Sequence, residues 1–199
     1  MKLFESISYQ NGNFQNLDLH QKRMNNSRKK LFSSADDINL FSALSRVNLN
    51  KFENEQLYKC RVLYSNDIEK VEFIPYKKPQ IKSLKIIHSN LNYEYKYEDR
   101  EELSSLYAKR ENCDDILIIK DELITDTYFC NILFYNGKNW ITPEKPLLKG
   151  VQRAYLLKNE KIETAIIKLQ DLKNFSKARL INALLEFDNS IEIMVSNIV

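Results

Sequence analysis

The sequence has few of the residues that build metal sites and disulfide frameworks. Its only histidines are His20 and His88, which excludes a histidine-rich metal site. Its three cysteines, Cys60, Cys113 and Cys130, are odd in number and show no metal-ligand spacing. We therefore expect free thiols, as in a protein of the reducing cytoplasm, and no metal.

Long apolar runs and a strong charge imbalance are also missing. No apolar run approaches the roughly 18 residues that a membrane-spanning helix needs, so we expect no membrane insertion. The first ten residues, MKLFESISYQ, turn polar too early for a signal peptide. The net charge of +3 is small and spread along the chain, so it does not favour nucleic acid as a partner.

What remains is the composition of an ordinary globular protein. Of its 199 residues, 43% are hydrophobic and 29% are charged, enough to bury a core as one large domain or as two small lobes that share a cleft. Helical and strand patterns are mixed with little parallel alternation. We therefore predict an α+β fold in two lobes, residues 1–91 and 92–199.

In the first lobe, local patterns predict two helices against a mainly antiparallel sheet. Residues 3–9 alternate as a strand does, and Asn11-Gly12-Asn13 predicts a hairpin turn. Asn16 or Asp18 is expected to cap a helix that ends near Leu31. The further expected elements are a helix over 36–47 and strands over 57–64, 68–75 and 81–88.

The second lobe is expected to centre on residues 113–143. This stretch predicts a buried strand over 116–119, a strand over 128–135, a tight turn at Asn136-Gly137 and a third strand through Trp140. Asp126 lies at the mouth of a strand, where it is either a turn cap or a charge held for a cationic ligand. The other expected elements are a helix over 99–110 capped by Asp99, a helix over 150–157, strands over 162–169, 177–187 and 191–195, and a helical turn over 170–175.

Several short motifs, in a common order, are similar to those of one enzyme family. The pattern T-[DE]-x-x-x-x-N-[IL]-x-F, formed here by Thr125, Asp126, Asn131, Ile132 and Phe134, resembles the class IV aminotransferase and aminodeoxychorismate lyase family of fold-type IV pyridoxal-phosphate enzymes. The other matches are H-x-x-R at His20 and Arg23, L-x-G-[IV]-x-R over 148–153, and N-A-L over 182–184. The resemblance covers most of the chain.

Pyridoxal phosphate needs an amine for covalent attachment, an acid for its ring nitrogen and an anion site for its phosphate. The resemblance implies Lys96 as the amine and catalytic base, with Lys82 and Lys85 as rivals further upstream. It implies Asp126 as the acid, at a place where the family usually has glutamate. As an alternative to each role, Lys96 is a solvated surface lysine and Asp126 a turn cap.

For the phosphate, the resemblance implies Arg23 together with the backbone amides of Val151 and Gln152 at a helix start. It also implies that Asn131, Asn182 and Ala183 bind or line the cofactor. The alternatives are an ordinary surface arginine in a basic helix, a glycine that merely precedes a helix, and an apolar core strand with one polar residue.

The resemblance further implies an N-terminally shortened family member, because the element that precedes the family's Phe-Glu pair is missing before Phe4-Glu5. The expected activity is that of a lyase resembling 4-amino-4-deoxychorismate lyase, which makes 4-aminobenzoate for folate synthesis. The alternatives are a branched-chain or D-amino-acid aminotransferase and a degenerate member without catalysis. A small-molecule amino substrate, a homodimer and a cytoplasmic location are expected with it.

Overall fold

The computed structural model describes residues 1–33, 36–49 and 52–199, which form two compact units. The first unit contains Met1–Lys78 and Tyr95–Asp99, and the second contains Pro79–Glu94 and Arg100–Val199. This division differs from the predicted boundary after residue 91. Residues 79–91 lie in the second unit because β5 (Leu84–His88) pairs in parallel with β6 (Asp115–Lys120) and not with the antiparallel strands before it.

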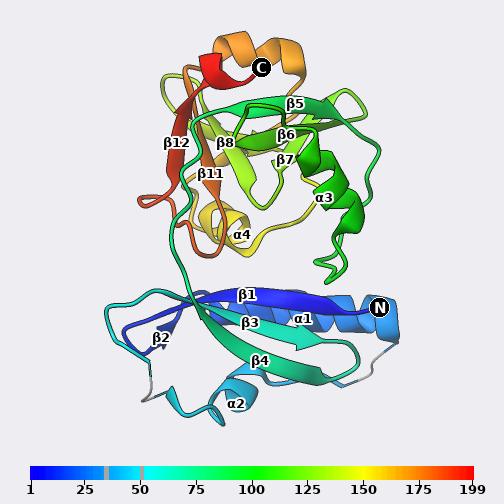
Figure 1. Cartoon of the computed structure of the whole chain (residues 1–199), viewed down its shortest axis with the longest axis vertical. Coiled ribbons are helices and arrows are strands. Elements are labelled where there is room, and N and C mark those ends of the chain that lie inside the picture. Colours follow the sequence, from blue (N-terminus) through cyan, green and yellow to red (C-terminus); the bar gives the residue numbers. More distant parts are fainter. Residues whose placement is uncertain (34–35, 50–51) are drawn as a thin grey trace. The chain divides into compact units, whose positions relative to one another are not determined.

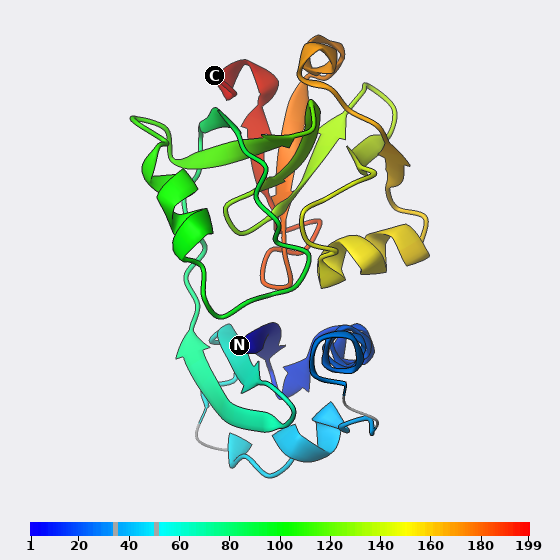
Figure 2. The same cartoon turned by 90° about the vertical axis from the view of Figure 1, so that its right-hand side faces the viewer.

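In the first unit, the described residues form a four-stranded antiparallel sheet in the order β2-β1-β3-β4 (Figure 1). The strands are β1 (Leu3–Gln10), β2 (Asn13–Phe14), β3 (Tyr58–Tyr64) and β4 (Ile68–Pro75). Helix α1 (Leu17–Phe32) lies along one face of this sheet (Figure 2), where Met24 packs with Ile7 and Val62. Asn16 is the residue before the helix, with its backbone in the left-handed region at φ 51°. Its side chain does not form the predicted capping hydrogen bond with the first turn of α1.

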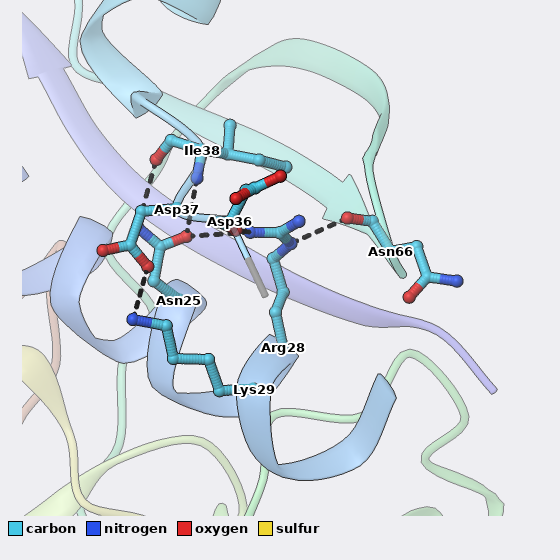
Figure 3. Close-up of polar contacts among 7 residues, drawn as sticks. All are labelled: Asn25, Arg28, Lys29, Asp36, Asp37, Ile38 and Asn66. Atoms are coloured by element: carbon cyan, nitrogen blue, oxygen red, sulfur yellow. Dashed lines mark hydrogen bonds and ion pairs between the residues drawn. The ribbon is translucent and has the colours of Figure 1, made fainter. Parts of the chain in front are cut away.

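Helix α2 (Leu40–Leu44) is shorter than the helix predicted over 36–47, because side chains of α1 bind the backbone of the residues before it. Arg28 donates to the backbone oxygens of Asp36 and Asn66, both at 2.8 Å (Figure 3). Asn25 pairs with both backbone polar groups of Ile38, at 3.1 and 3.2 Å. These bonds replace the helical ones that the backbone of 36–38 would otherwise need.

The segment Tyr95–Asp99 belongs to the first unit although the chain around it belongs to the second. It lies along the edge of β1 that β3 leaves open. Phe4 donates its N–H to the oxygen of Lys96 at 3.0 Å, and Glu98 donates to the oxygen of Lys2 at 2.9 Å. These bonds fix the backbone of Lys96 against the start of β1.

In the second unit, the described strands run in the order β10-β9-β8-β7-β6-β5, and β8 also pairs with β11, which pairs with β12. The strands not yet placed are β7 (Leu123–Thr127), β8 (Asn131–Tyr135), β9 (Trp140–Pro143), β10 (Glu163–Ala165), β11 (Lys177–Ile181) and β12 (Ile191–Met194). The helices are α3 (Glu101–Ala108), α4 (Val151–Lys158) and the 3-10 helices η2 (Leu169–Asn174) and η3 (Val195–Asn197). Strands β5–β6 and β9–β10 pair in parallel, and the other pairs are antiparallel.

Several elements of this unit differ from those predicted. Residues 123–127 form β7, where only a turn was expected, so Asp126 lies inside a strand and does not cap a turn. The strand predicted over 128–135 begins at Asn131, and the one predicted over 162–169 covers only 163–165. The strand predicted over 177–187 ends at Ile181, and α3 starts after Arg100, not at Asp99. The turn at Asn136-Gly137 and the helical turn near 170–175 are confirmed.

Two findings bear on the predictions from composition. Cys60, Cys113 and Cys130 are all free thiols. Within the part of the chain that the structure describes, none of the helices combines the length and the apolar character needed to span a bilayer.

Candidate functional site

Asp126 is a buried carboxylate whose two oxygens are both held by the second unit. It lies on β7 directly opposite Asn131 on β8, the register pair that joins these strands. Its Oδ1 accepts a hydrogen bond from Asn131 Nδ2 at 2.7 Å, and its Oδ2 accepts one from the backbone N–H of Leu148 at 2.9 Å. With only 5% of its surface exposed, the side chain is fixed in place rather than solvated.

Burial raises the pKa of Asp126 to about 6, against the hydrogen bonds from Leu148 and Asn131 and the charge of Arg153, which lower it. Arg153 is itself buried on α4, where it donates to Thr142 Oγ1 at 3.3 Å and to the oxygen of Pro143 at 2.8 Å. A buried carboxylate that is still mostly ionised near pH 7 stabilises a cation in its neighbourhood. Asp126 is thus a buried negative charge at pH 7.

Asn131 joins this carboxylate to the start of α4. Its Nδ2 also donates to the oxygen of Leu148 at 2.9 Å. Its Oδ1 lies so close to Gly150 that a Cβ at position 150 would be 2.0 Å away. Gly150 has an ordinary φ of −66°, so space and not backbone freedom requires glycine there. The acid and the N-terminus of α4 therefore form one rigid assembly.

The N-terminus of α4 carries the predicted phosphate amides, those of Val151 and Gln152. Both residues are buried in the first turn of this eight-residue helix. Backbone N–H groups and the helix dipole favour an anion at such a position. Asn131 therefore places the N-terminus of α4 beside Asp126.

Asn182 and Ala183 lie in a tight turn directly after β11. Asn182 Oδ1 accepts a hydrogen bond from the N–H of Leu184 at 2.8 Å, and Asn182 Nδ2 lies 3.3 Å from Cys130 Sγ. Because Ile181 pairs with Asn131, this turn lies next to the β7–β8 connection. The side chain of Asn182 thus ties the turn to the strands that carry Asp126 and Asn131.

Arg23 and Lys96 lie in the first unit. Arg23, on α1, forms a bidentate pair with Glu5 on β1: Nε donates to Oε1 at 2.9 Å, and Nη2 donates to Oε2. The Nδ1 of His20 lies 2.6 Å from the same Oε2. The Nζ of Lys96 lies 4.8 Å from the centroid of the Phe4 ring, beside this cluster.

The charges of this cluster depend strongly on one another. Although burial raises the pKa of Glu5, the charge of Arg23 and the hydrogen bond from His20 bring it down to about 2. Burial lowers the pKa of His20, to which the charges of Arg23 and Lys96 also contribute. At neutral pH the cluster therefore holds an ionised Glu5, a charged Arg23 and a neutral His20.

Within each unit the structure brings together residues that are distant in sequence: Arg23 and Lys96 in the first, and Asp126, Asn131, the start of α4 and Asn182 in the second. Glu5 and Arg153 are additions that the motifs did not assign to the site. Arg153 could have been found as the last position of L-x-G-[IV]-x-R. Glu5 could have been found as the only charged residue of the strand predicted over 3–9.

The donor set of the two units fits pyridoxal phosphate. The second unit supplies a buried carboxylate for a protonated ring nitrogen and a helix N-terminus for a phosphate, and Asn131 locks the two together. The first unit supplies an arginine and a partly buried lysine beside an aromatic ring. These are the three kinds of group that the cofactor requires.

The chain is similar to known proteins over nearly its whole length. Residues 99–187 match the family described as amino-transferase class IV. An uncharacterised protein of Haemophilus influenzae strain Rd is 34% identical over 183 residues, which are 92% of this chain and 97% of that protein. A crystal structure from Haemophilus somnus 129PT, provisionally described as a 4-amino-4-deoxychorismate lyase, has 32% identity and a TM-score of 0.88, and covers 94% of this chain and 97% of its own.

A more distant structure shares the fold. An aminotransferase from Brucella abortus, solved with its cofactor pyridoxal phosphate, has a TM-score of 0.74 at 15% identity over 96% of this chain and 80% of that one. The mixed architecture with two sheets matches that of fold-type IV pyridoxal-phosphate enzymes. This chain therefore belongs to the class IV aminotransferase family of pyridoxal-phosphate-dependent enzymes, which includes the aminodeoxychorismate lyase-like proteins.

Proposed function

We propose that this protein is a pyridoxal-phosphate-dependent lyase that eliminates pyruvate from 4-amino-4-deoxychorismate to give 4-aminobenzoate for folate synthesis. The cofactor assignment is carried by Asp126, a buried carboxylate held by Asn131 and Leu148 beside the start of α4. The choice of a lyase is supported by the similarity to the Haemophilus somnus protein, at 32% identity over 94% of this chain. The segment Asn182-Ala183-Leu184, which resembles that of the lyases, supports the same choice.

Each group of the site has a definite task in this reaction. When bound, pyridoxal phosphate supplies an electron sink for the carbanion that deprotonation of the substrate leaves. The charge of Asp126 would hold a proton on the ring nitrogen. Arg23 and the amides of Val151 and Gln152 would hold the phosphate. The Nζ of Lys96 would be the amine that holds the cofactor, and it would accept a proton from the substrate and return one to the leaving group.

A chemical label tests the assignment of Lys96. The purified protein should show a visible absorption band that borohydride removes, and peptide mapping should place the reduced adduct on Lys96. An adduct on Lys82 or Lys85 would show that the amine is misassigned; of these two, Lys85 forms an ion pair with Glu111 at 3.0 Å. A protein reconstituted with pyridoxal phosphate that shows no such band would favour a family member without catalysis.

Product formation tests the reaction itself. With 4-amino-4-deoxychorismate as the substrate, pyruvate and 4-aminobenzoate should form in equal amounts, measured by a coupled NADH assay and by fluorescence. Lys96→Ala should abolish both products while the circular dichroism spectrum is unchanged, because the amine that moves the proton is gone. Near-wild-type turnover in this variant would refute the mechanism.

The second candidate is transamination of branched-chain or D-amino acids, which the aminotransferase fold neighbours favour. An aminotransferase converts an amino acid to its 2-oxo acid only while an amino acceptor is present. Transfer between D-alanine or leucine and 2-oxoglutarate, without 4-aminobenzoate formation from 4-amino-4-deoxychorismate, would decide for it. We further propose, from the family resemblance, a cytoplasmic homodimer, which sedimentation of the holoenzyme tests.

A further inference from the structure

Glu5 is a fully buried carboxylate on β1. Its side chain has an exposed fraction of 0%, as has that of His20, whereas the side chain of Arg23 is 17% exposed. His20 and Arg23 lie three residues apart on α1 and so share one face of the helix. That face is turned toward Glu5, since both side chains bond to its carboxylate.

The bonds define the orientation of the guanidinium. Nε and Nη2 of Arg23 bind the two oxygens of one carboxylate, and such a parallel pair sets the plane of the guanidinium as well as its position. The third nitrogen of the guanidinium, Nη1, is not one of the two atoms of this bidentate pair, called the fork below. His20 Nδ1, at 2.6 Å from Oε2, fixes the carboxylate in turn. The orientation of Arg23 thus exists before any ligand arrives.

Burial makes this arrangement costly to break. An isolated carboxylate in the interior loses several kcal/mol of hydration, which only its ionic and hydrogen-bonding partners offset. Glu5 nevertheless stays ionised at neutral pH, because its pKa is held at about 2 by Arg23 and His20. The charges of Glu5 and Arg23 balance one another, so the cluster contributes direction to an incoming anion more than it contributes net charge.

We propose that Glu5 is a positioning residue that orients Arg23 for the phosphate of the cofactor, with His20 holding Glu5 in place. This inference rests on the proposed function, in which Arg23 binds that phosphate. An ion pair that only fastened β1 to α1 would affect stability alone. A positioning residue also affects how well the protein distinguishes a phosphorylated ligand from the same ligand without phosphate.

The orientation itself can be tested without cofactor. In nitrogen-15 spectra of the apoprotein, the Nε–H of Arg23, assigned by its loss in Arg23→Lys, should exchange slowly with water. In Glu5→Gln the same signal should exchange at least about tenfold faster, because the fork is lost. The Nε–H of Arg28, which donates to the backbone oxygen of Asn66 at 2.8 Å, is the control and should not change. A rapidly exchanging Arg23 signal in the wild-type apoprotein would overturn the inference.

The consequence for binding is tested with pyridoxal phosphate and pyridoxal as probes, titrated into the apoprotein. Glu5→Gln should weaken pyridoxal phosphate binding about tenfold or more, the effect of losing one charged bidentate bond, and should change pyridoxal binding less than about twofold. In the Arg23→Gln background, Glu5→Gln should have no further effect on the ratio of the two affinities. An equal loss for both probes, or an additive double variant, would overturn the inference.

Two further outcomes remain informative. Should Glu5→Gln fail to fold, Glu5→Asp retains the charge but withdraws it by one methylene, and a smaller loss of phosphate preference is expected; an unchanged preference would contradict the inference. Should the wild-type protein bind neither probe, the proposed function fails, and the exchange rate of the Arg23 signal still decides whether Glu5 orients the guanidinium.

Discussion

Asp126 is one methylene shorter than the glutamate that the family usually carries, and the structure shows how the shorter acid is held. Asn131 and the N–H of Leu148 bind its two oxygens at 2.7 and 2.9 Å. Desolvation by burial nevertheless raises its pKa to about 6. The buried charge therefore lowers the stability of the apoprotein, and a cationic ligand would offset that cost.

The raised pKa of Asp126 predicts that the effect of Asp126→Asn on the free energy of unfolding of the apoprotein depends on pH. The folded-state pKa is raised from 3.8 to about 6, so the stability from this group is complete below pH 3.8 and is lost as the pH rises through 6. The free energy of unfolding of Asp126→Asn relative to wild type should therefore shift in favour of the variant by about 2 kcal/mol between pH 4 and pH 7.

Urea denaturation of both proteins at the two pH values measures this shift. Asp121→Asn, in the exposed turn between β6 and β7, serves as the control and should shift little. A difference between Asp126→Asn and wild type that does not change with pH would contradict the prediction. With cofactor present, binding to the wild-type protein should weaken below pH 6, as Asp126 takes up a proton and loses its charge.

Two elements, β8 and α4, are joined at one contact, between Asn131 and Gly150. The contact leaves no room for a side chain at 150, since a Cβ would lie 2.0 Å from Asn131 Oδ1. Asn131 in turn bonds to Asp126 and Leu148. The position of the helix end relative to the acid is therefore set by packing between strand and helix, not by the local conformation of the glycine.

Gly150→Ala should push Asn131 away and break its hydrogen bonds, at a cost of about 1–3 kcal/mol in the free energy of unfolding. Urea denaturation measures the loss, with Lys149→Ala at the exposed neighbouring position as the control. Asn131→Ser should relieve the clash, so the double variant should lose less than the sum of the two single variants. Strict additivity would mean that the two residues do not touch.

A polar network holds residues 36–38, before α2, in addition to the packing of Ile38 against the core of the first unit. Arg28 is 4% exposed and bonds to the backbone oxygens of Asp36 and Asn66, while its neighbour Lys29 forms an exposed ion pair with Asp37 at 2.8 Å (Figure 3). The two cations are adjacent in the sequence and equal in charge. Their burial differs, and burial decides what each contributes.

Arg28→Met keeps most of the apolar stem but leaves the two carbonyl oxygens without their donor. We expect it to lower the free energy of unfolding by about 2–4 kcal/mol, whereas Lys29→Met should cost less than about 1 kcal/mol. Urea denaturation of the two variants compares them directly. Equal losses would show that the buried network adds nothing beyond an exposed ion pair.

For the molecule as a whole, the chain enters the second unit at Pro79, returns to the first for Tyr95–Asp99 and leaves it again at Arg100. The returning segment places Lys96 in the unit that carries Arg23, while Asp126 and the start of α4 belong to the other. The backbone bonds of Phe4 and Glu98 hold the returning segment on β1.

Native-state hydrogen exchange in increasing denaturant should show with which of the two units the segment 95–99 unfolds. The amide of Glu98 should share its opening free energy with that of Phe4, because each lies in the same set of bonds between the segment and β1. Amides of α3, only a few residues further along the chain, should follow the second unit. Exchange of Glu98 together with α3 and apart from Phe4 would contradict this assignment.

Much of the fold could be predicted from local patterns. The strand over 3–9, the helix that ends near Leu31 and the Asn136-Gly137 turn depend on neighbours within a few residues, and all three are found. Strand β7 was not predicted because the turn before it contains no glycine, the residue typical of such turns. Asp121 and Glu122 adopt the left-handed region there, at φ 49° and 63°. The parallel partner of β5 is about thirty residues away and leaves no local mark.

The sequence by itself determined the types and order of the candidate groups, because the motifs around Arg23, Lys96, Asp126 and Gly150 are short and local. Only the tertiary structure decided how those groups are held. The pairing of Glu5 with Arg23, the burial that raises the pKa of Asp126 and the contact of Asn131 with Gly150 all arise between separate elements. Hydrogen bonding and desolvation act through space, so they follow from packing and not from the order of residues along the chain.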